Sequence, residues 1–233
     1  MVFHSVRTSI QGGAKGSIMS RRKLRCYTGG FYHLFNKSIA GFEIFRYPEE
    51  YARMREMTRF YRDSLRGYSY SEALKRGLGI DDPEVHGVPR IRLIAYCFMP
   101  THFHFLVSQL SDDGAEDFMR CLQAGYAIYL NKRSRRRGPL WEGRFGIRRI
   151  ETDGDLLHMT RYVHLNPTSA GIVQRPGEWP YSSYHEYTGV VASGGICDFK
   201  QLISLSPQQY HKFVSDRIDY QRSLQIIKSY LMD

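Results

Sequence analysis

Four short segments of the chain carry the apolar and aromatic residues typical of β-strands. The first is the aromatic-rich run 31–35, which is bounded by two glycines and an asparagine. Two strongly β-prone runs, 91–98 and 103–109, are separated by a short segment with Met-Pro-Thr at 99–101, so they predict an antiparallel hairpin. We expect this hairpin to supply the central strands of a sheet. A fourth, shorter strand is predicted over 145–150.

Other segments show apolar residues at spacings of three and four, which predicts helices. One runs over 48–66 and begins with a proline and two glutamates, which suit the first turn of a helix. A second helix is predicted over 112–131. A third, 153–165, should stop at Asn166-Pro167, because proline disfavours the helical conformation in the residue before it.

The remaining segments read as less regular. Residues 67–90 contain several glycines and two prolines and predict a loop, with a helical turn at 71–76. Near the C-terminus we expect two short helices, over 207–214 and 217–231. Residues 1–22 show no periodicity and are interpreted as a flexible basic tail.

The order of the predicted elements is β-α-β-β-α-β, followed by a further helix. This order indicates an α+β protein with a ferredoxin-like, four-stranded antiparallel sheet and an added C-terminal helix. The predicted organisation is a tail over 1–22, one functional domain over 23–188 and a C-terminal helical extension over 189–233. A chain of 233 residues suffices for one substantial core.

Composition supports a folded protein with a polyanionic partner. Hydrophobic residues make up 42% of the chain and aromatic residues 14%, which is typical of globular proteins. The 33 Lys and Arg outnumber the 23 Asp and Glu, giving a formal net charge of +10. Nucleic-acid-binding proteins carry such an excess, although it also serves solubility. The positions of the charges along the chain therefore have to decide between nucleic-acid binding and solubility.

Cysteine usage and hydropathy bear on the compartment. The four cysteines contain no CxxC pair, so neither a zinc knuckle nor a disulfide framework is indicated. The chain also lacks a signal-peptide pattern and a run of about 18 apolar residues. We therefore expect a cytoplasmic protein with no membrane partner.

The first candidate for chemistry is the motif Thr101-His102-Phe103-His104-Phe105. Residues two apart on a strand face the same side, so both imidazoles project together and could hold one divalent metal ion. Phe103 should face the helix-covered core and leave the histidines on the open face of the sheet. Two ordinary histidines on a half-exposed strand are the alternative interpretation of this motif alone.

The second candidate is the pair Tyr162 and Asn166, which lie one helical turn apart and so share a face with His158. A phenol is a weak nucleophile at neutral pH, but it can attack a phosphodiester that a divalent metal polarises. The chain has 17 tyrosines, and Tyr162 could instead simply pack an amphipathic helix.

Together the two motifs resemble a known family. The segments 96–104 (YCFMPTHFH) and 161–171 (RYVHLNPTSAG) are similar to those of the single-tyrosine HUH transposases. Within that group, the segments 29–34 (GGFYHL), 140–145 (LWEGRF) and 179–184 (WPYSSY) resemble the REP-associated tyrosine transposases. The resemblance covers about residues 21–188. A lone HxH motif would be weak, but its combination with a downstream Tyr-x-x-x-Asn-Pro is specific.

The resemblance implies an enzyme, a metal-dependent single-strand DNA endonuclease and strand transferase. It implies that His102 and His104 bind Mg²⁺ or Mn²⁺, that Asn166 supplies a third ligand, and that Tyr162 attacks the scissile phosphate. The products would be a 5′-phosphotyrosine and a free 3′-hydroxyl. The implied partner is single-stranded or hairpin DNA, and the protein would act as a monomer or homodimer associated with the bacterial nucleoid.

A basic stretch follows the second long helix. It combines cations for phosphates with aromatic surfaces for bases, a mixture that suits single strands or hairpin tips. A solvated loop is the alternative interpretation of such a charge run. The predicted DNA-binding residues are Lys132, Arg133, Arg135, Arg136, Arg137, Trp141, Arg144, Arg148 and Arg149.

Three other functions compete with this interpretation. A relaxase or rolling-circle initiator would share the chemistry, but the chain shows no helicase segment and its tyrosine motif follows the transposase pattern. A non-catalytic DNA-hairpin binder would not need all of His102, His104, Tyr162 and Asn166. A small metallohydrolase would need a denser ligand cluster than the sequence offers.

Overall fold

The computed structural model describes residues 26–65, 68–79, 82–191 and 194–218. The predicted tail, 1–22, lies outside the described residues. The elements, in chain order, are β1 (Phe31–Lys37), η1 (Ile39–Gly41), α1 (Pro48–Tyr61), β2 (Asp63–Leu65), α2 (Tyr70–Lys75), β3 (His86–Pro89), β4 (Ile91–Met99), β5 (His102–Gln109), α3 (Gly114–Arg133), β6 (Gly146–Ile150), α4 (Asp153–Ser169), η2 (Pro176–Glu178), α5 (Tyr184–Tyr187) and α6 (Pro207–Ser215).

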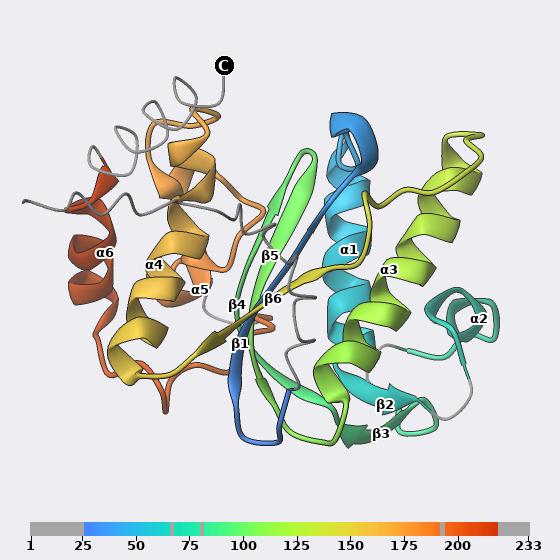
Figure 1. Cartoon of the computed structure of the whole chain (residues 1–233), viewed down its shortest axis with the longest axis horizontal. Helices are drawn as coiled ribbons and strands as arrows, with labels where there is room; N and C mark the ends of the chain where they lie inside the picture. Colours follow the sequence, from blue (N-terminus) through green and yellow to red (C-terminus); the bar gives the residue numbers. More distant parts are fainter. Residues whose placement is uncertain (1–25, 66–67, 80–81, 192–193, 219–233) are drawn as a thin grey trace, which may run out of the picture.

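The main sheet has four antiparallel strands in the order β4-β5-β1-β6. Helices α1 and α3 cover one face, and α4, α5 and α6 lie on the other (Figure 1). This is the ferredoxin-like arrangement with an additional helix after the last strand. The predicted fold class is confirmed.

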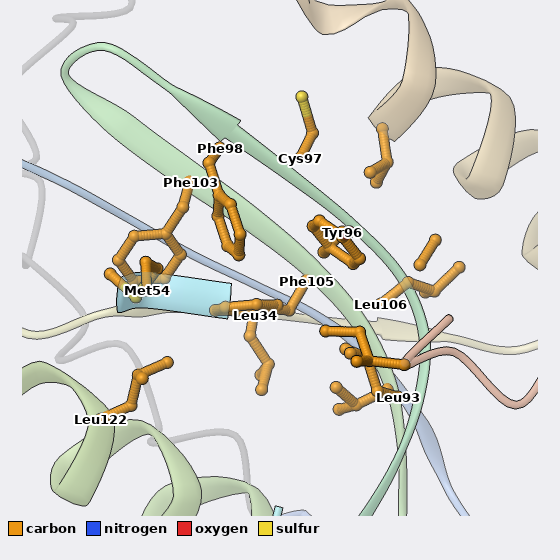
Figure 2. Packing of buried hydrophobic residues seen from close by; sticks show 14 of the residues in the cluster. Leu34, Met54, Leu93, Tyr96, Cys97, Phe98, Phe103, Phe105, Leu106 and Leu122 are labelled. Carbon is orange, nitrogen blue, oxygen red and sulfur yellow. The ribbon is translucent and has the colours of Figure 1, made fainter. Parts of the chain in front are cut away.

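Alternation along β1 and β5 places the core between the sheet and the helices α1 and α3. Phe103, Phe105 and Leu34 are fully buried on this side, where Met54 of α1 and Leu122 of α3 meet them (Figure 2). Burial of each such side chain stabilises the fold by roughly 1.5–3 kcal/mol. Because Phe103 and Phe105 are fixed on this face, His102 and His104 face the other one.

The hairpin prediction is confirmed, but only β5 is a central strand, whereas β4 lies at the edge of the sheet. The sequence is misleading here because β4 is almost continuously buried. Helices cover both of its faces, and the segment 181–183 runs along its free edge. There Phe98 N–H donates to Tyr181, and Ser183 N–H donates to Tyr96.

Helix α4 does not stop before Pro167, as predicted, but continues to Ser169. The proline removes one backbone donor from the last turn. Its ring is buried. After the proline, Ala170 N–H still donates to the carbonyl of Asn166, the residue before the proline. The bias against helix before a proline is therefore outweighed, and Asn166 keeps helical geometry relative to Tyr162.

The segment 67–90 is more regular than the predicted loop. The expected helical turn is helix α2, whose N-terminus is capped by the Ser69 hydroxyl accepting from Glu72 N–H. The pairing of β2 with β3 was not predicted, because strands of three and four residues show no periodicity. This pairing also ends α1 at Tyr61, before the predicted residue 66.

At the C-terminus, the predicted helix over 207–214 is α6, and the second one, 217–231, lies mostly outside the described residues. Among the helices that the structure describes, none has the length and apolarity needed to cross a lipid bilayer.

Candidate active site and DNA-binding surface

The histidines of β5 sit at the end of the sheet where the β4–β5 turn lies. Their ring centroids are 5.1 Å apart, and the rings are nearly perpendicular. The half-buried His102 has its Nδ1 3.1 Å from the Thr101 hydroxyl, and His104 is buried. Contrary to prediction, His104 is not on an open face, because α4 covers this part of the sheet.

His104 has one partnered and one unpartnered ring nitrogen. Its Nδ1 lies 2.9 Å from Nε2 of His33 on β1, and its buried Nε2 has no hydrogen-bond partner among the described residues. Burial lowers the pKa of His102, with a further contribution from Lys37, and lowers that of His104 well below its usual range. Burial, aided by Arg148, lowers the pKa of His33 to about 4. The three rings are therefore neutral at neutral pH.

Helix α4 brings Tyr162 to these histidines. The tyrosine ring stands edge-on to both, 5.8 Å from the centroids of His33 and of His104. Its side chain is 40% exposed, so it also reaches solvent. One turn later, the Asn166 amide donates to the Tyr162 carbonyl over 3.0 Å. It also lies close enough to His104 to oppose the lowering of that pKa.

The structure thus brings together the four residues that the two motifs single out: His102, His104, Tyr162 and Asn166. Within the described part of the chain, no three His, Cys, Asp or Glu side chains are grouped so as to hold a metal ion. The donors available at this place are two imidazoles and one amide oxygen, since the Asn166 NH₂ group is the one bonded to Tyr162.

His33 belongs to this cluster, and the sequence interpretation assigned it no role. Its side chain is 5% exposed. The signal was available in the alternation of β1, because Leu34 points into the core and His33 must face the other side. What the sequence lacked was the register that pairs β1 with β5.

Two cavities flank the cluster. One, of about 640 Å³, lies between β6 and α4 and is lined by Tyr162, His33, Phe35, Arg148 and His158 among others. The other, of about 530 Å³, is lined by His102, His104, Phe35, Lys37, Glu142 and Arg144 among others. His158 otherwise pairs with Arg161 of the same helix, over 2.7 Å.

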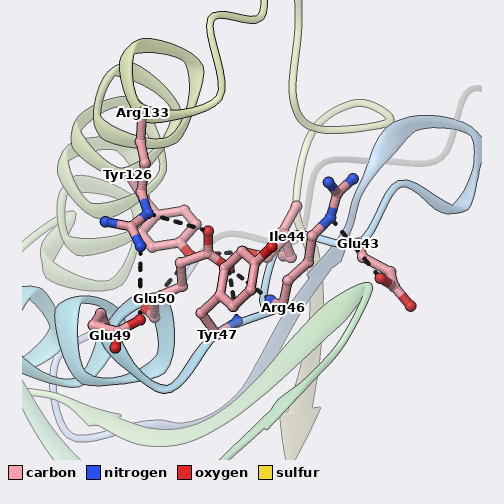
Figure 3. A network of polar contacts seen from close by, with 8 residues as sticks. All are labelled: Glu43, Ile44, Arg46, Tyr47, Glu49, Glu50, Tyr126 and Arg133. Carbon is pink, nitrogen blue, oxygen red and sulfur yellow. Dashed lines mark hydrogen bonds and ion pairs between the residues drawn. The ribbon is translucent and has the colours of Figure 1, made fainter.

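The basic stretch divides into two groups. Arg133 lies 3.6 Å from Glu49 and from the buried Glu50, which tie the end of α3 to the start of α1 (Figure 3). Arg136 donates to the carbonyls of Gly138 and Pro139 and lies over the Phe42 ring. These two arginines stabilise the fold.

The second group, Lys132, Arg135 and Arg137, is exposed. No carboxylate of the described residues forms an ion pair with any of the three. Of the basic stretch, these cations are the most available to a phosphate backbone.

Trp141 is half-buried rather than displayed on the surface. Its indole N–H donates to the Gln123 carbonyl over 3.1 Å, and its ring stands edge-on to Phe103 at 5.4 Å. Trp141 therefore fastens the chain after the basic stretch to the core, and base stacking by this residue stays a prediction.

The three arginines that follow are exposed. Arg144 borders the cavity of the histidine pair, and Arg148 and Arg149 border that of Tyr162. Arg149 also lies over the Tyr27 ring.

Curated proteins with detectable sequence similarity are transposases. A putative REP-associated tyrosine transposase of Haemophilus influenzae is 32% identical over 103 residues, which are 40% of this chain and 58% of that protein. A REP-associated tyrosine transposase of Escherichia coli is 33% identical over 46 residues, 20% of this chain and 28% of that protein. The chain thus spans less than two thirds of either relative. No protein-family model matches it.

Among solved structures, a REP-associated tyrosine transposase bound to a REP hairpin superposes with a TM-score of 0.53 at 19% identity. The match covers 78% of this chain and 95% of that one, and it supports the fold. By fold and sequence, the chain is similar to tyrosine transposases, which are enzymes. More particularly, it is similar to the REP-associated tyrosine transposases, which confirms the resemblance seen in the motifs.

Proposed function

We propose that the protein is a metal-dependent single-strand DNA endonuclease and strand transferase that acts on hairpin-containing DNA through Tyr162. The observation that carries this proposal is the position of Tyr162 beside His104, whose buried Nε2 has no partner among the described residues. A buried imidazole nitrogen without a partner costs stability. Such a cost is expected where the nitrogen takes part in chemistry, here beside a phenol that reaches solvent.

The donor set fits a divalent metal ion. When Nδ1 of His104 donates to the neutral His33, the lone pair on Nε2 is free to bind a cation. His102 Nε2 and the Asn166 amide oxygen would be the other protein ligands, and Mn²⁺ accepts such mixed nitrogen and oxygen donors. When bound, the metal polarises the phosphate and stabilises the charge that develops during the transfer.

The chain's own residues would act on the DNA strand as follows. The Tyr162 oxygen attacks the phosphorus, its proton passes to solvent, and the new O–P bond leaves a 5′-phosphotyrosine. The P–O3′ bond breaks, and the departing oxygen takes up a proton to become a 3′-hydroxyl. The reverse attack by a 3′-hydroxyl restores a phosphodiester and frees Tyr162, which is strand transfer.

The surrounding charges support a nucleic-acid substrate. Exposed arginines border both cavities, and the exposed cations of the basic stretch add to the net charge of +10. The similar solved structure holds a REP hairpin, which favours hairpin DNA for this chain as well. A nucleoid-bound protein of the bacterial cytoplasm would meet such DNA.

The deciding experiment is to incubate the full chain with end-labelled hairpin DNA carrying single-stranded flanks, with Mn²⁺ or with EDTA. We expect a covalent protein–DNA adduct only with the metal, and mass spectrometry of the digested adduct should locate the nucleotide on Tyr162. Attachment to another tyrosine, or hydrolysis without any adduct, would contradict the proposal.

A further inference from the structure

Phe35 is an exposed aromatic residue on β1, a strand in which several other residues are buried. Tyr32 and Leu34 of the same strand are fully buried, whereas Phe35 is 39% exposed. Its ring stacks on His33, with centroids 5.0 Å apart and planes 26° apart, and lies 6.2 Å from the ring of His104. An exposed aromatic ring therefore lies beside the candidate metal ligands.

The orientation of this ring is built into the sheet. Phe35 pairs with Gly146 of β6, and its ring lies directly over that glycine. A Cβ atom at position 146 would overlap with the ring. Any other residue at position 146 would thus push the phenyl group aside, whereas glycine lets it lie across the β1–β6 half of the sheet.

Phe35 also borders both cavities of the site. On one side lies the cavity of Tyr162 and on the other that of His102 and His104. A phosphate placed between the tyrosine and the histidines would have its neighbouring nucleotides in these two cavities. A DNA strand threaded through the site therefore has to pass over the Phe35 ring.

The charges around the ring fit a nucleotide better than an apolar partner. Arg148 lines one cavity, and Lys37 and Arg144 line the other. An exposed aromatic ring between cations is the combination that binds single-stranded DNA, because bases stack on the ring while cations neutralise phosphates. A protein-docking surface would instead present a contiguous apolar patch.

We propose that Phe35 is the stacking platform for an unpaired base of the DNA strand, adjacent to the scissile phosphate. The position next to the scissile phosphate rests on the proposed function, whereas stacking itself is a property of binding alone. The ligand class is an unpaired nucleotide, of either purine or pyrimidine type, since every base offers a π-face.

The test is a coupling experiment in the Tyr162→Phe background without metal, so that cleavage cannot interfere. The probes are a DNA hairpin with a single-stranded flank and versions in which one abasic site is moved along the flank. We expect Phe35→Leu to weaken binding of the intact probe roughly 5- to 150-fold, as the loss of one stacked base would. With one abasic probe, the same substitution should have little further effect.

Controls separate stacking from folding. Phe35→Tyr and Phe35→Trp keep a ring and should restore binding. Tyr47→Leu removes an aromatic side chain that is 55% exposed, at the start of α1 on the other face of the sheet, and should leave binding unchanged. If Phe35→Leu fails to fold, Phe35→Met takes its place in the same coupling experiment.

The outcomes are distinct. An equal loss with every abasic probe, or no loss at all, would overturn the role of Phe35, whether or not the adduct forms. Coupling at one position in a protein that forms no adduct would keep the stacking platform and refute the proposed cleavage. Coupling at a position remote from a mapped cleavage site would overturn the placement beside the scissile phosphate.

Discussion

Nε2 of His33 and Nδ1 of His104 lie 2.9 Å apart, on two neighbouring strands of the sheet. Both side chains are buried, so the bond fixes the orientation of the His104 ring, which lies beside Tyr162 and Asn166. If His104 is a metal ligand, His33 is the residue that positions it.

Substitution of His33 should therefore weaken metal binding before it affects DNA binding. We expect His33→Phe to lower the Mn²⁺ affinity about 10- to 100-fold, as the loss of an outer hydrogen bond does. His33→Gln can still accept from His104 and should recover part of it. Electron paramagnetic resonance of free Mn²⁺ measures this without activity, and equal affinities for both variants would contradict it.

Tyr162→Phe removes one oxygen and keeps the ring against His33 and His104. Folding and hairpin binding should persist while the covalent adduct disappears. Tyr47→Phe, an exposed tyrosine on the opposite face, should form the adduct at the wild-type rate. The gel shift of the labelled DNA under denaturing conditions distinguishes the two results.

The three proposed ligands should act as one unit. His102→Ala, His104→Ala or Asn166→Ala should each reduce cleavage nearly as much as the triple substitution, because effects on one ion are not additive. EDTA should have the same effect on the wild-type protein. A double His102→Ala and His104→Ala protein that still cleaves in EDTA would show that the strand histidines are structural.

The exposed cations of the basic stretch should govern salt dependence. Replacing Lys132, Arg135 and Arg137 by Ala should weaken binding to all DNA sequences and reduce the slope of log K against log salt by up to roughly 2, at about 0.7 for each phosphate contact. The control Arg76→Ala with Arg120→Ala removes exposed cations elsewhere and should leave the slope intact. An unchanged slope in the triple variant would make the stretch an ordinary solvated loop.

The link between α4 and α6 should be visible in stability. The buried His164 bonds to the Tyr210 hydroxyl and to the Ser183 hydroxyl, each over 2.7 Å. Tyr210→Phe leaves one buried imidazole nitrogen unsatisfied, which should cost about 1–3 kcal/mol of unfolding free energy. Urea unfolding measures this, with the exposed Tyr27→Phe as a control that should change it little.

Sequence periodicity predicted the strands and long helices because burial imposes it directly, as Phe103 and Phe105 show. It could not reveal the register between β1 and the predicted hairpin, so the contact of His33 with the diagonally placed His104 was missed. The edge position of β4 was hidden for the same reason, since the apolar run reports burial and not neighbours.

Local signals misled where tertiary packing outweighed them. Pro167 suggested a helix end, yet it lies within α4 and is buried. Trp141 suggested a displayed aromatic surface, yet its indole is bonded to Gln123. Phe35, which the sequence placed simply in a strand, is the ring that the fold leaves in the open.

The hydrogen bonds of His164 also hold Tyr162 in place relative to the histidines of the sheet. Through His164, the helix that carries Tyr162 is tied both to α6 and, by way of Ser183, to the backbone of Tyr96 on β4. These bonds hold α4 against the sheet of the same chain from two sides. Within one chain, they keep Tyr162 and Asn166 of α4 beside the histidines of β5.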